Sequence, residues 1–160
     1  MTIWKEWESW TFEYFDLDTD ASNFPGGEAF IDLWNKKRGD RQLPSWSDYD
    51  WDDFTPWWGS VVVTDVMWEP YDFQYRLYGS KVVEQFEVDV TGKKASELFG
   101  GEYDQSVAIE FYEMIGNKPY ISRCSGTIHW QNRDSRKVTF LDLMLSDTGE
   151  RVNNGVSIMF

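Results

Sequence analysis

The chain has 160 residues, the usual size of one domain, and its 28 Asp and Glu residues outnumber its 15 Lys and Arg residues to give a formal charge of −13. Such an acidic surface repels nucleic-acid phosphates and anionic lipid headgroups, which argues against both as partners. Aromatic residues make up 18% of the chain, so it has the large apolar side chains that a folded core needs, and its single cysteine excludes an intrachain disulfide.

The first twenty residues form an amphipathic segment whose periodicity fits two conformations. Trp7, Trp10 and Tyr14 fall on one face at helical spacing. Trp10, Phe12 and Tyr14 also alternate as they would in a strand. Helix is favoured at the start, and a change to strand near Trp10 is left open. In either conformation we expect an N-terminal cap, residues 1–24, that packs on an apolar partner.

The middle of the chain predicts one helix, an irregular segment and two strands. The helix is expected at residues 28–37, between the break at Pro25-Gly26-Gly27 and the stop at Gly39. Residues 42–58 are expected to be irregular or to form short helices anchored by aromatic rings. The two strands are expected at residues 61–68 and 73–78.

Short helices and three strands complete the chain. The helical pieces are expected at residues 80–86, 95–99 and 102–115. The strands are expected at residues 120–131, 137–146 and 151–160. Asp147-Thr148-Gly149-Glu150 is a strong hairpin signal between the last two.

Hairpins separated by a helical insertion predict an α+β fold, with a five-stranded antiparallel sheet and short helices on one face. The strand at residues 137–146 is apolar on both sides, with Phe140 on one and Leu141 on the other. Such a sheet needs cover on both faces, and we expect the N-terminal cap or a second subunit to supply the second cover. No repeat or linker is visible, so residues 25–160 are predicted to form a single domain.

No segment marks the chain for a membrane or for export. The densest apolar run, residues 60–68, already contains Asp65 and is far too short to span a bilayer. The first residues lack the basic start and the small-residue cleavage site of a signal peptide. We therefore expect a cytoplasmic protein.

The element order and several central motifs resemble the PAS domain. The motifs are Trp34 followed by Arg38-Gly39, then Tyr75-Arg76-Leu77-Tyr78-Gly79, and then Asp89-Val90-Thr91-Gly92. Together they are similar to short bacterial single-domain PAS-like proteins over residues 30–99, and the remainder matches by strand order. The resemblance implies a sensory module with a pocket and a homodimer formed through the N-terminal segment and the outer sheet face. It identifies no cofactor. Because no output region follows the last strand, it also implies signalling to a protein partner in trans.

We expect the pocket to be lined by seven apolar or aromatic side chains, with Arg76 as a polar group. They are Phe73, Tyr75 and Leu77 from the sheet and Phe86, Phe99, Phe111 and Tyr112 from the helices. Plain core packing is the alternative for these seven, and a cavity of about 300 Å³ or more would distinguish the two. Arg76 and Arg123 could each hold a carboxylate ligand, but pairing with an acid of the chain's own surface is favoured.

Other candidate chemistry is weaker. His129 lies in a predicted strand, whereas haem-binding PAS domains take their histidine from the helical region. Cys124 also lies in a strand, outside the helical Asn-Cys-Arg context of flavin photosensors. The acidic run at residues 48–53 starts like a calcium loop, but Asp53 stands where that loop needs glycine and Gly59 where it needs glutamate. No metal site is predicted.

The sequence therefore predicts a non-catalytic sensory or regulatory module that binds a small, largely apolar ligand and signals to a partner protein. The alternative is an interaction or dimerisation module with a filled core. A third hypothesis is a small enzyme with a buried acid such as Asp142 or Asp65. A raised pKa for either carboxyl inside a cavity would support that hypothesis.

Overall fold

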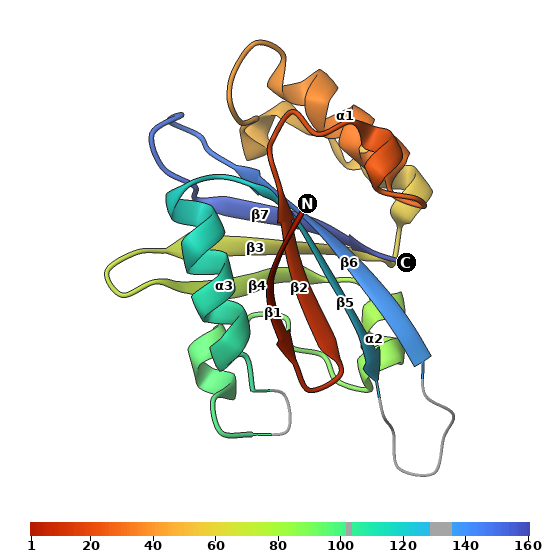
Figure 1. Cartoon of the computed structure of the whole chain (residues 1–160), viewed down its shortest axis with the longest axis vertical. Helices are drawn as coiled ribbons and strands as arrows, with labels where there is room; N and C mark the ends of the chain where they lie inside the picture. The colour runs from red at the N-terminus through yellow and green to blue at the C-terminus, as the bar shows by residue number, and fades with distance from the viewer. Residues whose placement is uncertain (102–103, 129–135) are drawn as a thin grey trace.

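The computed structural model describes residues 1–101, 104–128 and 136–160. Within these residues, seven strands form one antiparallel sheet in the order β1-β2-β5-β6-β7-β3-β4 (Figure 1). The strands are β1 (Thr2–Trp7), β2 (Trp10–Phe15), β3 (Val61–Met67), β4 (Asp72–Tyr78), β5 (Ile121–Ile128), β6 (Arg136–Leu145) and β7 (Asn154–Met159). The helices are α1 (Glu28–Arg38), α2 (Ser80–Phe86) and α3 (Ser106–Asn117), with shorter 3-10 turns η1 (Ala21–Asn23), η2 (Trp46–Asp48), η3 (Trp51–Trp57) and η4 (Ala95–Leu98). None of these helices is long and apolar enough to cross a membrane.

The predicted antiparallel sheet is confirmed for β3 to β7, but the sheet has seven strands and not five. The two additional strands come from the N-terminal segment, where a helix was favoured. Residues 2–15 form a hairpin, and β2 pairs with β5 so that Phe12 lies opposite Cys124. The hairpin turns at Glu8-Ser9, with Glu8 at a φ of 53°. The segment therefore extends one edge of the sheet as a β-hairpin, and its role as a cap remains a prediction.

Helices cover both faces of the sheet, where the sequence predicted them on one. We call the face under α2, η4 and α3 the inner face, and the face under α1 and the turns η1 to η3 the outer face (Figure 1). β6 shows why both faces need helices, because it carries apolar side chains on each of them. Phe140, Asp142 and Met144 point to the inner face, while Leu141 and Leu143 point to the outer face.

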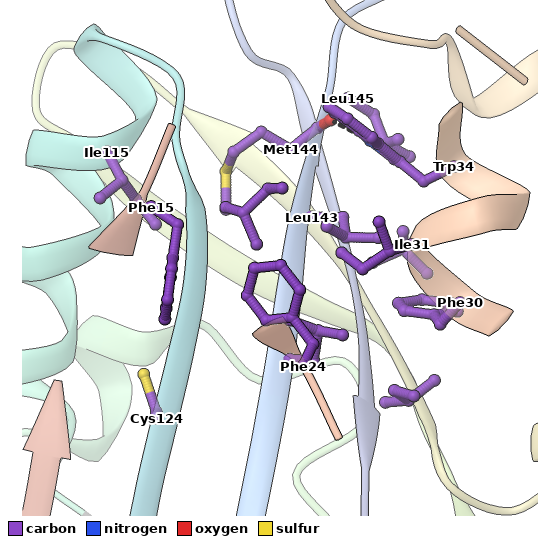
Figure 2. Packing of buried hydrophobic residues seen from close by; sticks show 14 of the residues in the cluster. Phe15, Phe24, Phe30, Ile31, Trp34, Ile115, Cys124, Leu143, Met144 and Leu145 are labelled. Atoms are coloured by element: carbon purple, nitrogen blue, oxygen red, sulfur yellow. Dashed lines mark hydrogen bonds between the residues drawn. The ribbon is translucent and has the colours of Figure 1, made fainter. Parts of the chain in front are cut away.

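α1 packs on the outer face through Phe30, Ile31 and Trp34, and Figure 2 shows Ile31 beside Leu143 and Trp34 beside Leu145 of β6. The Trp34 side chain is fully buried, and its indole N–H donates to the Met144 carbonyl at 3.1 Å. This hydrogen bond satisfies the polar atom of a buried ring and fixes the helix to the centre of the sheet. α1 therefore occupies part of the face on which a homodimer was predicted, and that homodimer remains a prediction.

Candidate functional site

A cavity of about 620 Å³ lies between the inner face of the sheet and the helices α2, η4 and α3. This volume is in the range of small-molecule sites. Side chains from three strands and two of the helices form most of its aromatic wall. They are Trp10 and Phe12 of β2, Phe73 and Tyr75 of β4, Phe86 of α2, Tyr112 of α3 and Phe140 of β6.

The structure brings half of the predicted site residues together in this wall: Phe73, Tyr75, Phe86 and Tyr112. Phe73 is at their centre, with its ring in edge-to-face contact with Tyr75 and with Tyr112 at centroid distances of 5.5 Å. Their position on the cavity is a finding, while their binding of a ligand remains a prediction.

Arg76 does not line the cavity, and Leu77 does not either, because β3 and β4 lose register between Val63 and Thr64. A one-residue shift moves every later side chain to the opposite face of a strand. Leu77 therefore pairs with Val63 and faces outward, and Tyr78 takes the cavity position that the alternation assigned to Leu77.

Phe99 and Phe111 also lie outside the cavity wall. Phe99 follows η4 and is 50% exposed. Phe111 is fully buried, but its ring packs against Trp4 at 5.2 Å and Phe12 at 5.3 Å. It joins α3 to the N-terminal hairpin, a contact that the sequence could not reveal while the hairpin was unrecognised.

Asp142 is the polar group at the centre of the inner face, and it is 4% exposed. Its Oδ1 accepts a hydrogen bond from Ser157 Oγ at 2.6 Å, and its Oδ2 accepts one from Ser122 Oγ at 2.8 Å. These serines are its cross-strand neighbours on β7 and β5. Burial raises the pKa of Asp142, and the two serine hydrogen bonds offset that rise only in part.

Tyr112 and Cys124 complete the polar cluster around Asp142. The Tyr112 hydroxyl is 3.9 Å from Cys124 Sγ, and both groups lower the pKa of the Asp142 carboxyl. Burial raises the pKa of the Tyr112 phenol and of the Cys124 thiol well above their usual values. Cys124 is therefore a protonated wall residue and lacks the thiolate character of a reactive cysteine.

Both candidate arginines pair with acids of their own chain, as predicted. Arg76 binds Asp65 at 2.6 Å on the outer side of β4. Arg123 binds Glu13 through two hydrogen bonds of 2.7 and 3.1 Å across β5 and β2. Neither guanidinium faces the cavity.

The remaining candidates carry no metal site in the described part of the chain. Asp48 and Asp53 of the acidic run accept hydrogen bonds from the backbone N–H groups of Ser45 and Asp50, so they cap the short turns η2 and η3. No group of three or more His, Cys, Asp or Glu side chains among the described residues could hold a metal ion. His129 lies outside the described residues.

The geometry defines the chain as an α+β domain whose antiparallel sheet and helices enclose a ligand-sized cavity. A model of the PAS domain matches residues 23–153, and the chain belongs to the PAS domain family. The family is one of sensory and regulatory modules that are generally non-catalytic. Comparison with curated proteins and with solved structures gave no significant match.

Proposed function

We propose that this chain is a non-catalytic sensory module of the cytoplasm that binds a small, largely apolar ligand in the inner cavity and signals to a partner protein in trans. The observation that supports this proposal is the cavity of about 620 Å³ with its aromatic wall. Its volume is about twice the roughly 300 Å³ at which small-ligand sites begin. It weighs against the alternative of an interaction module with a filled core.

The N-terminal hairpin offers a route from the ligand to a partner. Trp10 stacks on Phe86 and on Phe140 at centroid distances of 6.4 Å, so a ligand in the cavity would touch the hairpin directly. The same hairpin supplies β1, the edge strand of the sheet. We therefore keep the N-terminal segment as the proposed homodimer surface, with the part of the outer face that α1 leaves uncovered.

One observation favours an enzyme as the second candidate. Asp142 is a buried carboxyl with a raised pKa inside a cavity, which is the environment of many general acids and bases. Turnover of a bound small molecule that is lost in Asp142→Asn would support the enzyme. Release of the unchanged molecule on denaturation supports the sensor.

Native mass spectrometry of the purified chain, with an absorption spectrum of the same sample, tests the proposal. We expect a mass excess that disappears on denaturation. Ala108→Trp fills the cavity from α3 and is expected to abolish this excess. Ala29→Trp is the matched control, because Ala29 is exposed on α1 beyond the other face of the sheet. A mass excess that survives Ala108→Trp would contradict binding in this cavity.

A further inference from the structure

The charged side chains that line the cavity are all acidic in the described part of the chain. They are Asp142 at its centre, the exposed Glu8 and the half-buried Asp104, and no described Lys or Arg joins them. The chain as a whole has a formal charge of −13. A cavity lined by one sign of charge in a protein of the same sign concentrates ligands of the opposite charge.

Among the described residues, Asp142 has hydrogen-bond donors but no cation as a partner. Its described hydrogen-bond partners are the hydroxyls of Ser122 and Ser157, and the Tyr112 phenol and the Cys124 thiol that also influence it are neutral as well. No described Lys or Arg forms an ion pair with it. Each carboxylate oxygen can accept more than one hydrogen bond, so both retain acceptor capacity. A buried carboxyl without a counter-ion is costly to the fold, and a ligand with positive charge would supply the missing partner.

The aromatic wall next to Asp142 suits the same ligand. Tyr112 lines the same cavity as Asp142, and Phe73 and Tyr75 extend the wall from Tyr112 through their edge-to-face contacts. The faces of such rings attract cations, most strongly where water is excluded. The rest of the wall is apolar and accepts the body of the ligand.

These observations deepen the proposed function and rest on it. We propose that the ligand is an organic cation, a protonated amine on an apolar body, whose ammonium group binds Asp142 while the body packs against the aromatic wall. A carboxylate or phosphate ligand would meet the Asp142 carboxyl without a described cation to offset the repulsion. A neutral ligand would add no counter-ion to that carboxyl, which has none among the described residues.

Three probes of one skeleton test the inference: 4-phenylbutylamine, 4-phenylbutan-1-ol and 4-phenylbutyrate. The amine is protonated at neutral pH, as a lysine is. Binding to the full chain is measured by isothermal titration calorimetry, on protein that native mass spectrometry shows to be free of bound ligand. We expect the amine to bind at least about tenfold more tightly than the alcohol, because the ammonium adds a charge-assisted hydrogen bond. The anion is expected to bind most weakly.

The variant Asp142→Asn keeps the size of the side chain and removes its charge. We expect the affinity for the amine to fall to that for the alcohol, whose binding is retained and shows that the variant is folded. Asp32→Asn is the control, because it makes the same change in net charge at an exposed position of α1. It should leave the order of the three affinities unchanged.

Equal binding of amine and alcohol, or an amine preference that survives Asp142→Asn, would overturn the inference while the sensor proposal stands. Failure of all three probes to bind would overturn it as well. The mass excess in native mass spectrometry would then decide the proposed function separately.

Discussion

A carboxyl group occupies the centre of the inner face at Asp142, where β6 places apolar side chains at the positions on either side, Phe140 and Met144. Its folded-state pKa is raised by burial, so the folded protein binds more protons than the unfolded chain at pH values between the unfolded and folded pKa. The contribution of this group to the free energy of unfolding is therefore fully present below its pKa in the unfolded chain. It is lost as the pH rises through its pKa in the folded protein. Above that window the ionised carboxyl destabilises the fold.

We expect Asp142→Asn to be more stable than the natural chain at pH 8, because the neutral amide avoids the cost of burying a charged carboxylate. The advantage should shrink as the pH is lowered and should be lost below the unfolded pKa of about 3.9, where the carboxyl is protonated in both states. The Tyr112 phenol and the Cys124 thiol lie near the same carboxyl, but their pKa values are raised, so neither adds a transition in this range.

Urea unfolding at several pH values measures the difference in stability between Asp142→Asn and the natural chain. An Asn variant that is less stable at pH 8 would contradict the assignment. If Asp142→Asn is more stable but no longer prefers the amine, the Asp142 carboxyl serves ligand binding at a cost in stability.

The N-terminal hairpin depends on a glycine in the strand beside it. Gly126 of β5 lies opposite Trp10, and a Cβ at this position would overlap the Trp10 indole. We expect Gly126→Ala to push Trp10 out of its stack with Phe86 and Phe140 and to lower the free energy of unfolding by about 1 to 3 kcal/mol. Urea unfolding and the tryptophan emission spectrum measure the two effects.

Gly101→Ala is the matched control for this substitution. A Cβ at Gly101 would meet only the Leu98 carbonyl oxygen, at the ordinary contact distance of 3.6 Å. Its stability and emission are expected to stay close to those of the natural chain. Equal effects of the two substitutions would mean that Trp10 does not hold the hairpin in place.

Most helices and strands could be predicted from the sequence, but the N-terminal hairpin could not. α2 spans the predicted residues 80–86, and α1 ends beside Gly39 as its stop signal indicated. The N-terminal turn at Glu8-Ser9 has none of the Asn or Gly residues that mark such turns. The aromatic spacing was then compatible with helix and strand alike, and only pairing with β5 decides between them.

The cavity could be predicted in part, for a related reason. Phe73 and Tyr75 were found because strand alternation holds at the start of β4, and Leu77 was misplaced because the register shift leaves no sequence signal. Phe140 and Trp10 were missed, although both line the cavity, because their meeting depends on the order of distant strands. Asp142 was singled out, but its position against Ser122 and Ser157 follows from the pairing of β6 with β5 and β7.

In the whole molecule, the N-terminal hairpin links the cavity to the edge of the sheet. Trp10 and Phe12 of β2 face the cavity, and β1 forms the outer edge with Ile3, which is 50% exposed. An edge strand offers unpaired backbone groups to a second chain. Two copies that meet there each carry a formal charge of −13, so their repulsion opposes the contact.

The proposed homodimer is therefore expected to strengthen as salt is added, because the screening length falls from about 30 Å at 0.01 M to about 8 Å at 0.15 M ionic strength. Size-exclusion chromatography with light scattering, over a range of salt and protein concentrations, measures the dissociation constant. Ile3→Glu adds a charge at the β1 edge and should weaken the dimer at every salt concentration. Trp58→Glu is the control, since Trp58 is also exposed, at 58%, but lies between η3 and β3, and four strands separate β3 from β1 in the sheet. A chain that stays monomeric at every salt and protein concentration would contradict the homodimer proposal. Equal effects of Ile3→Glu and Trp58→Glu would contradict the proposal that the N-terminal hairpin forms the interface.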